Sequence, residues 1–544
     1  MVPLRPPGLG RRWYLGLVAV CCLFASGLSW HFFVQPLNPL PDQSVSVQAA
    51  LRYAQGLGFT NVVVDQDLAQ PASAWLVLFP LGYPLLIGTM AKGGLAIDVA
   101  IKLVNALALV LGVLGWVRLG VGYLHRRSWQ IVFCALLVLI GGSLVPLGGT
   151  ADYIFWAGMP YWLHLIIRSH SEGGAQAKWS AVIGAAVIAA ALISVRWAAA
   201  ILVPAGCLIL LCDALRNRSL TARTLVRLVV YGAVPTTLYI ALVVINKSHS
   251  DAASTVLSFV KPEWQFDKLW YSYPLETLTT LPLGFDVLLR RLWRLAGPAE
   301  GSGLFRFAFT FLIPVAMLLA VVVARRRLRP ILPWGALDNA VVIACLANIA
   351  FLAFMSVRYT WNNTNWSYLD EPRYFRPFLP AIALWWLCII ERGLLTKRIL
   401  NAAALAVMAG VVFYLLQASV RWERAYLQAP DPHGELTARI LALPETGRMK
   451  VVFDADISRY VVHERPRFLT FGYPDQAVTE RLASSAPMDV WIVKRIREKD
   501  VYSLDPELHL KRVSALIHRF NAQKVWVSQD QSFEIYQARI DKKP

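Results

Sequence analysis

The stretch "AIDVAIKLVNALALVLGVLGWVRLGVGYLHRR", residues 96–127, determines the fold class of this chain. Residues 96–124 are mostly apolar and exceed the roughly 20 residues that a helix needs to cross a bilayer. The basic pair Arg126 and Arg127 follows directly. A long apolar run that ends in a basic cluster is typical of a transmembrane helix, so we expect this segment to span a membrane.

The composition of the whole chain supports the same class. The chain has 544 residues, of which 57% are hydrophobic and only 16% charged, and its mean hydropathy is +0.49. An aqueous fold cannot bury so much apolar surface. The net charge of +19 would suit a nucleic-acid partner in a soluble protein. Here the basic residues form short clusters between apolar runs, which predicts a membrane protein and no nucleic-acid partner.

Ten further apolar runs make eleven in all, and they predict a polytopic α-helical membrane protein with about eleven transmembrane helices. The seven cysteines all lie in apolar runs without CxxC spacing, so we expect neither disulfides nor a cysteine metal site. The predicted spans are residues 13–35, 96–124, 129–147, 153–168, 179–194, 197–213, 227–245, 304–324, 338–355, 374–391 and 399–417.

The charges of the loops predict the orientation. Short loops alternate between basic ones and nearly neutral ones such as "PLGGTAD" (146–152) and "SVRW" (194–197). By the positive-inside rule the N-terminus is then cytoplasmic. No cleavage site follows the first span and the loops are short, so we expect a bacterial inner (plasma) membrane. The basic residues of the inner loops are Arg5, Arg11, Arg12, Arg126, Arg127, Arg168, Lys178, Arg216, Arg218, Arg223, Arg227, Arg325, Arg326, Arg327, Arg329, Arg392, Lys397 and Arg398.

Three long segments fall outside the membrane in this orientation: residues 36–95, residues 246–303 and everything after 418. The first contains "WLVLFPLGYPLLIGTM" (75–90), which prolines interrupt and which predicts an interfacial helix. The last has strand-like runs such as "MDVWIVK" and "FEIYQAR" beside the helical "PELHLKRVSALIHRF". We therefore expect a membrane domain over residues 1–417 and an extracytoplasmic (periplasmic or extracellular) α/β domain over residues 418–544.

An isolated acid, Asp42, lies in "LPDQSVSVQAALRYAQGLGFT" (40–60), in the first outside loop. Apolar residues recur at helical spacing from Val47 to Leu57, and Gly56 and Gly58 end the predicted helix. Asp42 is therefore at or near a helix N-terminus. It fits a helix cap or a general base at the membrane face, and the local residues leave both roles open.

The order of several short motifs resembles the GT-C glycosyltransferases, which include protein mannosyltransferases, the aminoarabinose transferases of lipid A and RgtA/B/C/D-like enzymes. A first span and an outside acid precede Ala50, Tyr53, Ala54, Gly56, Gly58 and Phe59, and the motifs "FPLGYPLLIGTM", "TADYIFWAGMPYWLHLIIR", "SVRWAAAILVPAG" and "DEPRYFRPFLPAIAL" then follow. The resemblance extends to about residue 391. It implies a GT-C fold and an enzyme that moves a sugar from a polyprenyl-phosphate carrier to a lipid, glycan or protein acceptor outside the membrane.

The resemblance implies roles for individual residues. Asp42 would deprotonate the acceptor hydroxyl as general base. Cations at the outer face, Arg373, Arg376, Arg358 and Arg196, would meet the lipid phosphate, although interfacial arginines also snorkel for other reasons. Asp152 would orient the acceptor; pairing with Arg196 and capping the fourth helix are its alternatives. The aromatic candidates for stacking on a sugar are Tyr53, Tyr83, Tyr374, Trp361 and Trp366, which would also fit an aromatic belt.

The chain departs from one relative's pattern. Protein mannosyltransferases have two adjacent acids in this loop, whereas Gln43 follows Asp42 here. Asp65 and Asp67 could supply a second carboxylate for a divalent cation, and they also fit a polar turn. P-loop, GxGxxG and HExxH motifs are absent from the sequence, so we expect no nucleotide chemistry. A transporter or flippase and a polysaccharide polymerase or ligase are the alternative functions.

Overall fold

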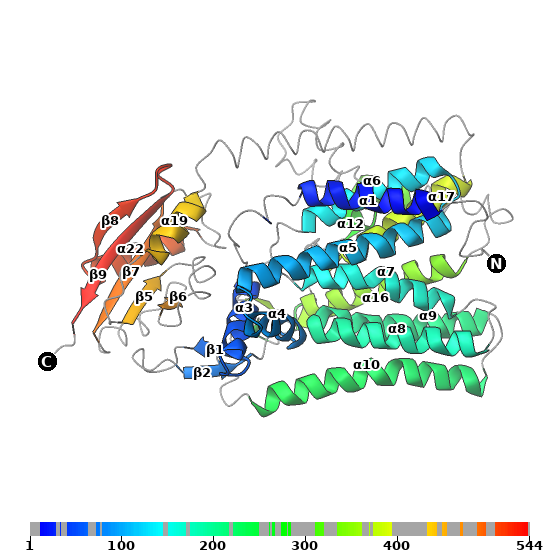
Figure 1. Cartoon of the computed structure of the whole chain (residues 1–544), viewed down its shortest axis with the longest axis horizontal. Coiled ribbons are helices and arrows are strands. Elements are labelled where there is room, and N and C mark those ends of the chain that lie inside the picture. Colours follow the sequence, from blue (N-terminus) through cyan, green and yellow to red (C-terminus); the bar gives the residue numbers. More distant parts are fainter. Residues whose placement is uncertain are drawn as a thin grey trace.

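The computed structural model consists of a helical bundle and, beside one end of it, a small β-sheet domain (Figure 1). The structure describes residues 11–28, 33, 41–63, 72–76, 79–144, 151–169, 175–216, 221–249, 260–261, 264–266, 274–279, 281–283, 311–319, 335–358, 360–361, 369, 374–393, 432–442, 449–453, 468–471, 487–496 and 506–541.

Long helices coincide with most of the predicted spans. Residues 311–319, within the predicted span 304–324, are also helical, and the predicted span 399–417 lies outside the described residues. The helices of the bundle are α1 (Arg11–Leu28), α5 (Ile97–Tyr123), α6 (Arg127–Leu144), α7 (Asp152–Arg168), α8 (Ala175–Val195), the 3-10 turn η2 (Trp197–Ile201) that continues into α9 (Leu202–Arg216), α10 (Ala222–Ser248), α16 (Ala336–Arg358) and α17 (Leu379–Gly393).

The predicted span 374–391 begins too early. Residues 374–378 form turns, and the helix α17 starts at Leu379. Pro377 explains the difference, because a proline pushes the preceding residue, here Arg376, away from helical backbone angles. The turn leaves Tyr374 and Arg376 at the mouth of the bundle instead of inside a helix.

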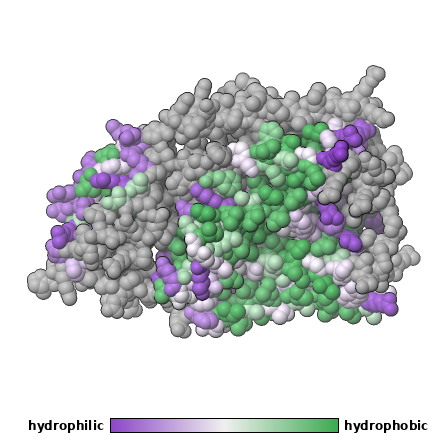
Figure 2. Space-filling view, in the orientation of Figure 1, coloured by the Kyte–Doolittle hydropathy of each residue, from purple (hydrophilic) through white to green (hydrophobic). Residues whose placement is uncertain are grey.

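Apolar residues cover the middle of the bundle on the face seen in Figure 2, with hydrophilic residues toward its two ends. Four helices of the described part are long and apolar enough to cross a membrane: α5, residues 197–216, residues 222–246 and α16. Large apolar side chains such as Leu107 of α5 and Val229 of α10 are exposed on the outside of these helices. Apolar exposure of this kind suits contact with lipid, so the protein is an integral membrane protein.

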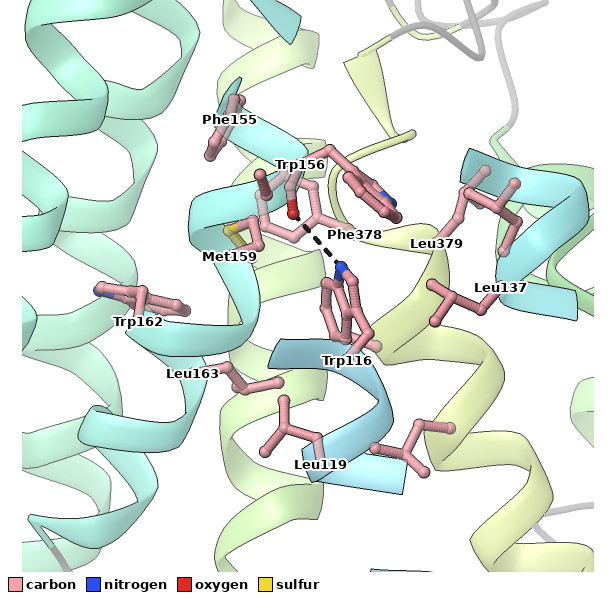
Figure 3. Close-up of a cluster of buried hydrophobic side chains, with 14 of the residues drawn as sticks. Trp116, Leu119, Leu137, Phe155, Trp156, Met159, Trp162, Leu163, Phe378 and Leu379 are labelled. Carbon is pink, nitrogen blue, oxygen red and sulfur yellow. Dashed lines mark hydrogen bonds between the residues drawn. The ribbon is translucent and has the colours of Figure 1, made fainter. Parts of the chain in front are cut away.

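Glycine notches set the packing of α5 against α7. A Cβ atom at Gly112 would collide with the indole of Trp156, and one at Gly115 would lie 2.6 Å from Pro160 Cγ. The two helices therefore run parallel with close backbones. The indole Nε1 of Trp116 donates a hydrogen bond to the carbonyl oxygen of Trp156, at 3.3 Å, in the most buried part of the bundle (Figure 3).

Two short helices and a hairpin cover one end of the bundle, which we call the α3 end (Figure 1). They are α3 (Pro41–Ala54), α4 (Gly82–Lys92) and the antiparallel strands β1 (Thr60–Val63) and β2 (Ala72–Trp75). Gly56 and Gly58 have positive φ angles of 80° and 72°, which explains how the chain turns after α3. The sequence predicted a helix at each of these two positions, but the second helix begins at Gly82 and not at residue 75, which belongs to β2.

The C-terminal region forms a five-stranded sheet of order β6-β5-β7-β9-β8, parallel from β6 to β7 and antiparallel from β7 to β8. One face packs on α22 and the other on α19, as the alternation along β7 requires. The expected α/β character is confirmed. The elements are α19 (Pro432–Leu441), β5 (Met449–Phe453), β6 (Phe468–Phe471), β7 (Met488–Arg495), α22 (Pro506–Arg519), β8 (Gln523–Val527) and β9 (Phe533–Ile540).

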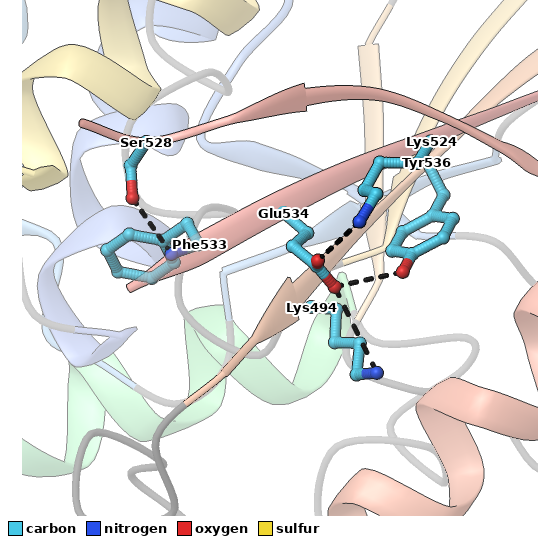
Figure 4. A network of polar contacts seen from close by, with 6 residues as sticks. All are labelled: Lys494, Lys524, Ser528, Phe533, Glu534 and Tyr536. Carbon is cyan, nitrogen blue, oxygen red and sulfur yellow. Dashed lines mark hydrogen bonds and ion pairs between the residues drawn. The ribbon is translucent and has the colours of Figure 1, made fainter. Parts of the chain in front are cut away.

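An exposed ionic network lies on this sheet (Figure 4). Glu534 of β9 accepts a hydrogen bond from Lys524 of β8 at 3.0 Å and another from the hydroxyl of Tyr536 at 2.9 Å. The ammonium of Lys494 is 4.0 Å from the same carboxylate. These pairs join three neighbouring strands, and none of their residues belongs to the predicted site.

Carboxylates also brace the bundle away from the α3 end. Glu391 of α17 accepts hydrogen bonds from the backbone amides of His125, at 3.0 Å, and Arg126, at 2.6 Å, in the turn between α5 and α6. Asp338 in the first turn of α16 accepts from the indole of Trp385 at 2.9 Å and from the amide of Gly335 at 2.7 Å. Each oxygen of both carboxylates therefore has a donor.

Candidate active site at the α3 end

A buried ion pair forms the centre of the candidate site. Asp152 is the first residue of α7, and Arg196 lies in the turn between α8 and η2. Arg196 Nη1 is 2.7 Å from Asp152 Oδ1, with side chains that are 17% and 2% exposed, respectively. The pairing alternative for Asp152 is thus observed. Ala151 occupies the capping position and makes no capping hydrogen bond through its side chain, so Asp152 is not the N-cap residue of α7.

Tyr374 connects this pair to two further helices. The guanidinium of Arg196 lies over the ring of Tyr374, 5.8 Å from its centroid. Asn348, buried on α16, donates a hydrogen bond of 3.4 Å to the carbonyl oxygen of Tyr374. The ion pair therefore joins the beginnings of α7, η2 and α17, which are far apart in the sequence.

One carboxylate oxygen of Asp152 accepts no hydrogen bond from the described residues. This oxygen, Oδ2, is also buried. A buried acceptor without a donor costs free energy, about 1–3 kcal/mol. Native structures tolerate such an atom where a water, an ion or a ligand supplies the missing donor. This atom is therefore available to a hydroxyl or ammonium group of a bound molecule.

Tyr83 has the same property. It lies on α4, is fully buried, and its hydroxyl makes no hydrogen bond within the described ranges. Burial raises the pKa of Tyr83 well above its ordinary value, so the group remains a neutral hydroxyl. The preceding residue, Gly82, touches the backbone of Ser194, two residues before Arg196. The close approach that Gly82 permits brings α4 against the turn that carries Arg196.

Asp42 lies in the first turn of α3, at the same end of the bundle. The helix begins at Pro41, which suits the first helical position because its missing N–H would have no partner there. A carboxylate in the first turn also interacts favourably with the helix dipole. The side chain of Asp42 lies outside the described residues, so its role stays a prediction.

The other predicted residues fall into three groups. Arg358 ends α16 and lies over the ring of Trp264, 5.2 Å from the centroid, while Arg376 is half-buried two residues after Tyr374. Tyr53 stacks on Phe59, with centroids 4.4 Å apart, and lies below the ammonium of Lys92. Arg373, Trp366 and the side chain of Trp361 lie outside the described residues.

A metal site can be tested only in part. Within the described ranges, no three His, Cys, Asp or Glu side chains come together in a way that could hold a metal ion. Asp65, Asp67 and the side chain of Asp42 are not among those ranges. The described residues thus offer a single carboxylate, Asp152, near Arg196, and a divalent cation stays a prediction.

Sequence reasoning missed two buried asparagines. Asn348 holds Tyr374, and Asn105 of α5 is buried with an Oδ1 atom that makes no hydrogen bond. Both interrupt long apolar runs, and an amide inside a membrane helix is costly unless it has a partner. That interruption is the signal that could have drawn attention to them.

The fold is that of the GT-C glycosyltransferases. ArnT from Cupriavidus metallidurans, bound to undecaprenyl phosphate, aligns with a TM-score of 0.52 and 14% identity, over 97% of this chain and 98% of that one. The archaeal oligosaccharyltransferase AglB from Archaeoglobus fulgidus, in complex with an inhibitory peptide and a dolichol-phosphate, aligns with a TM-score of 0.51 and 11% identity, over 96% of this chain and 74% of that one. Identities this low establish the fold alone.

No family model matches the sequence. No curated protein sequence matches it either. The resemblance expected from the short motifs is confirmed by the structural alignments, that is, by the arrangement of the helices in space.

Proposed function

We propose that this protein is a glycosyltransferase that moves a sugar from a polyprenyl-phosphate carrier to an acceptor at the α3 end. One observation carries the proposal. A GT-C bundle holds, at that end, a buried carboxylate whose second oxygen has no donor among the described residues, beside an arginine with residual exposure. An anionic donor and a hydroxylated acceptor or sugar supply the complementary groups.

The reaction assigns Asp42 the role of general base. The acceptor oxygen attacks the anomeric carbon, and Asp42 takes the hydroxyl proton as the new glycosidic bond forms. The bond between the anomeric carbon and the phosphate oxygen breaks, and its electron pair leaves with the lipid phosphate. Both oxygens of Asp42 remain acceptors while it is ionised, which the role requires.

Arginines at the α3 end would stabilise the leaving phosphate. The candidates are Arg196, Arg358, Arg373 and Arg376. Guanidinium groups bind phosphate oxygens in a bidentate manner and stay charged throughout. Arg196 has the best support among them, because its partner Asp152 already holds it in a fixed direction and its side chain keeps some exposure.

The acceptor or the sugar would contact Asp152, Tyr53, Tyr83 and Tyr374. Asp152 Oδ2 accepts a hydroxyl, and the hydroxyl of Tyr83 can donate or accept. The known structures support a lipid-linked donor, since ArnT binds undecaprenyl phosphate and AglB was solved with a dolichol-phosphate and a peptide. The acceptor is accordingly a lipid, a glycan or a protein.

The basic loops support a cytoplasmic N-terminus in a bacterial inner membrane, with the α3 end and the C-terminal α/β domain outside. In this orientation the reaction takes place where nucleotide sugars are absent. A lipid-linked donor is the form in which an activated sugar reaches that side.

The test is sugar transfer by purified protein in detergent, with polyprenyl-phosphate sugars as donors. We expect Asp42→Asn to reduce transfer by about 10²–10⁴-fold, the usual contribution of a general base, while the thermal unfolding midpoint stays unchanged. Gln43→Ala, one residue away, is the matched control and should keep its activity. Unaltered transfer by Asp42→Asn would exclude the general-base role, and uptake into vesicles without a glycosyl product would favour a transporter.

A further inference from the structure

Arg118 of α5 is an unusual residue for a membrane helix. Exposed apolar side chains follow one face of α5 through Leu103, Leu107 and Leu111, and Arg118 continues this face at helical spacing. It is itself exposed. In the described part of the chain its guanidinium makes no hydrogen bond or ion pair. An exposed arginine near the end of a membrane helix extends its guanidinium toward the lipid headgroups, where it can pair with an anionic group outside the chain.

Polar side chains of two neighbouring helices surround Arg118. Helix α5 lies between α1 and α7 (Figure 1). Tyr14 of α1 donates a hydrogen bond of 3.1 Å to the carbonyl of Leu114, and Tyr161 of α7 donates one of 2.7 Å to that of Leu111. On α7, Tyr161, His164 and Arg168 recur at spacings of three and four residues and therefore share one face, and the charge of Arg118 contributes at both tyrosines and at His164.

The second cation of the group is Arg168, the last residue of α7, which also acts on His164. Arg118 lies five residues before the end of α5, and His164 four residues before the end of α7. At 1.5 Å per residue both are about 6–8 Å from the helix ends. The glycine contacts between α5 and α7 independently require this equal depth.

The depth corresponds to the lipid headgroups at the end of the bundle opposite α3. There a phosphate bound to Arg118 would lie toward the face of α7 that carries His164 and Arg168, and its acyl chains would follow the exposed leucines of α5. Basic pockets between helices at the cytoplasmic side recognise anionic headgroups in this way. A polyprenyl phosphate suits the site less, because the proposed reaction uses that lipid at the other end.

We propose that Arg118, His164 and Arg168, with Tyr14 and Tyr161, form a binding site for an anionic phospholipid of the leaflet opposite the α3 end. The phosphate pairs with Arg118, and the tyrosine hydroxyls, which already donate to α5, accept from its headgroup. The site is separate from the candidate active site, and only the preference for a phospholipid over a polyprenyl phosphate rests on the proposed function.

The test is native mass spectrometry of the full-length protein in detergent, with phosphatidylglycerol or phosphatidylcholine added. We expect the wild type to retain phosphatidylglycerol preferentially. Arg118→Leu should weaken its binding about fivefold, the usual effect of one basic residue near an anionic headgroup. Arg216→Leu, an exposed arginine at the end of α9, is the matched control and should change binding less than about twofold. Arg118→Gln replaces Arg118→Leu if that variant does not fold.

Three results would overturn the site. Equal retention of the two phospholipids would show that no headgroup is selected. Equal losses in Arg118→Leu and Arg216→Leu would indicate diffuse attraction by the basic end of the bundle. Displacement of phosphatidylglycerol by inorganic phosphate at millimolar concentration would identify free phosphate as the ligand. Because no glycosyl transfer is measured, a failure here leaves the proposed function untouched.

Discussion

The buried carboxylates at the two ends of the bundle differ in how many of their oxygens accept a hydrogen bond. Away from α3, Glu391 and Asp338 have a donor on each oxygen, supplied by backbone amides and an indole. At the α3 end, Asp152 has Arg196 on one oxygen and no donor from the described residues on the other. The first arrangement uses all of the hydrogen-bonding capacity for holding helices together. The second keeps part of that capacity for a ligand.

This difference separates stability from function within one fold. A carboxylate satisfied by its own chain stabilises the turn that it caps, and its loss should be felt in unfolding. A buried carboxylate with an oxygen that lacks a donor lowers the stability of the fold, and natural proteins tolerate this cost at functional sites. Substitutions at the α3 end should therefore change the transfer activity, and substitutions at the opposite end should change the unfolding midpoint.

The largest difference is expected between Asp152→Asn and Glu391→Gln. Asp152→Asn leaves Arg196 without its counter-charge, which costs about 3–5 kcal/mol for a buried pair and less where, as here, the arginine keeps some exposure. It should also abolish most of the transfer activity. The double variant Asp152→Asn with Arg196→Met should recover thermal stability without recovering activity.

Glu391→Gln should behave in the opposite way. Its amide cannot accept from both backbone N–H groups, so unfolding becomes easier by about 1.5–3 kcal/mol, while kcat per folded molecule is unchanged. Thermal unfolding in detergent and transfer kinetics measure both. The comparison fails if Asp152→Asn with Arg196→Met transfers sugar at the wild-type rate.

A smaller effect is expected for two buried tyrosines. Tyr83→Phe removes a buried hydroxyl that has no partner in the part of the chain that the structure describes, so stability should rise by up to about 1–3 kcal/mol while the KM for donor or acceptor increases. Tyr231→Phe is the matched control. Its hydroxyl donates to the carbonyl of Leu202 at 2.6 Å and accepts from the indole of Trp162 at 2.9 Å.

Tyr231→Phe should therefore lower the unfolding midpoint and leave the KM unchanged. If Tyr83→Phe lowers stability as Tyr231→Phe does, the Tyr83 hydroxyl has a partner in the folded protein, and its proposed availability to a substrate is wrong.

The smallest effect belongs to the ionic network of the sheet. Partial burial raises the pKa of Glu534, but the hydrogen bonds from Lys524 and Tyr536 and the charges of Lys524 and Lys494 lower it more, so the pKa lies below 4.5. A depressed carboxyl pKa stabilises the fold above the pKa of the unfolded chain, and this contribution is lost as the pH falls through the folded value.

Glu534→Gln should thus be less stable than the wild type at pH 7, by less than about 1 kcal/mol. The difference should shrink as the pH falls through the lowered pKa of Glu534 in the folded protein, and it should not grow above the pKa of the unfolded chain. Thermal unfolding at a series of pH values provides the measurement. Asp541→Asn, at an exposed carboxylate 3.8 Å from Arg539, is the control and should show no such change.

The sequence was sufficient to predict most of the described helices of the bundle but only part of the candidate site. Apolar runs locate α5, α8 and α10 within a few residues, because a bilayer sets the length of a span directly. The pairing of Asp152 with Arg196 could be considered because both charges stand beside apolar runs that end at the same face of the bundle.

Contacts that depend on packing across the bundle could not be anticipated. The position of Tyr374 below Arg196 follows from the non-helical turn before α17, which Pro377 produces and which the apolar pattern hides. The complete burial of Tyr83 depends on the approach of α4 to α8 at Gly82. Side-chain periodicity within one segment holds no information about either contact.

The glycine notches of α5 have a consequence for the height of the site in the membrane. Trp156 and Pro160 fit beside Gly112 and Gly115, so α7 cannot slide along α5 without a collision. Asp152 is the first residue of α7, so its depth along the membrane normal is fixed by the position of that helix. A displacement by one helical turn would move its carboxylate by about 5.4 Å, out of reach of Arg196. These contacts deep in the bilayer thus fix the distance of Asp152 and Arg196 from the membrane surface, where they would meet their substrates.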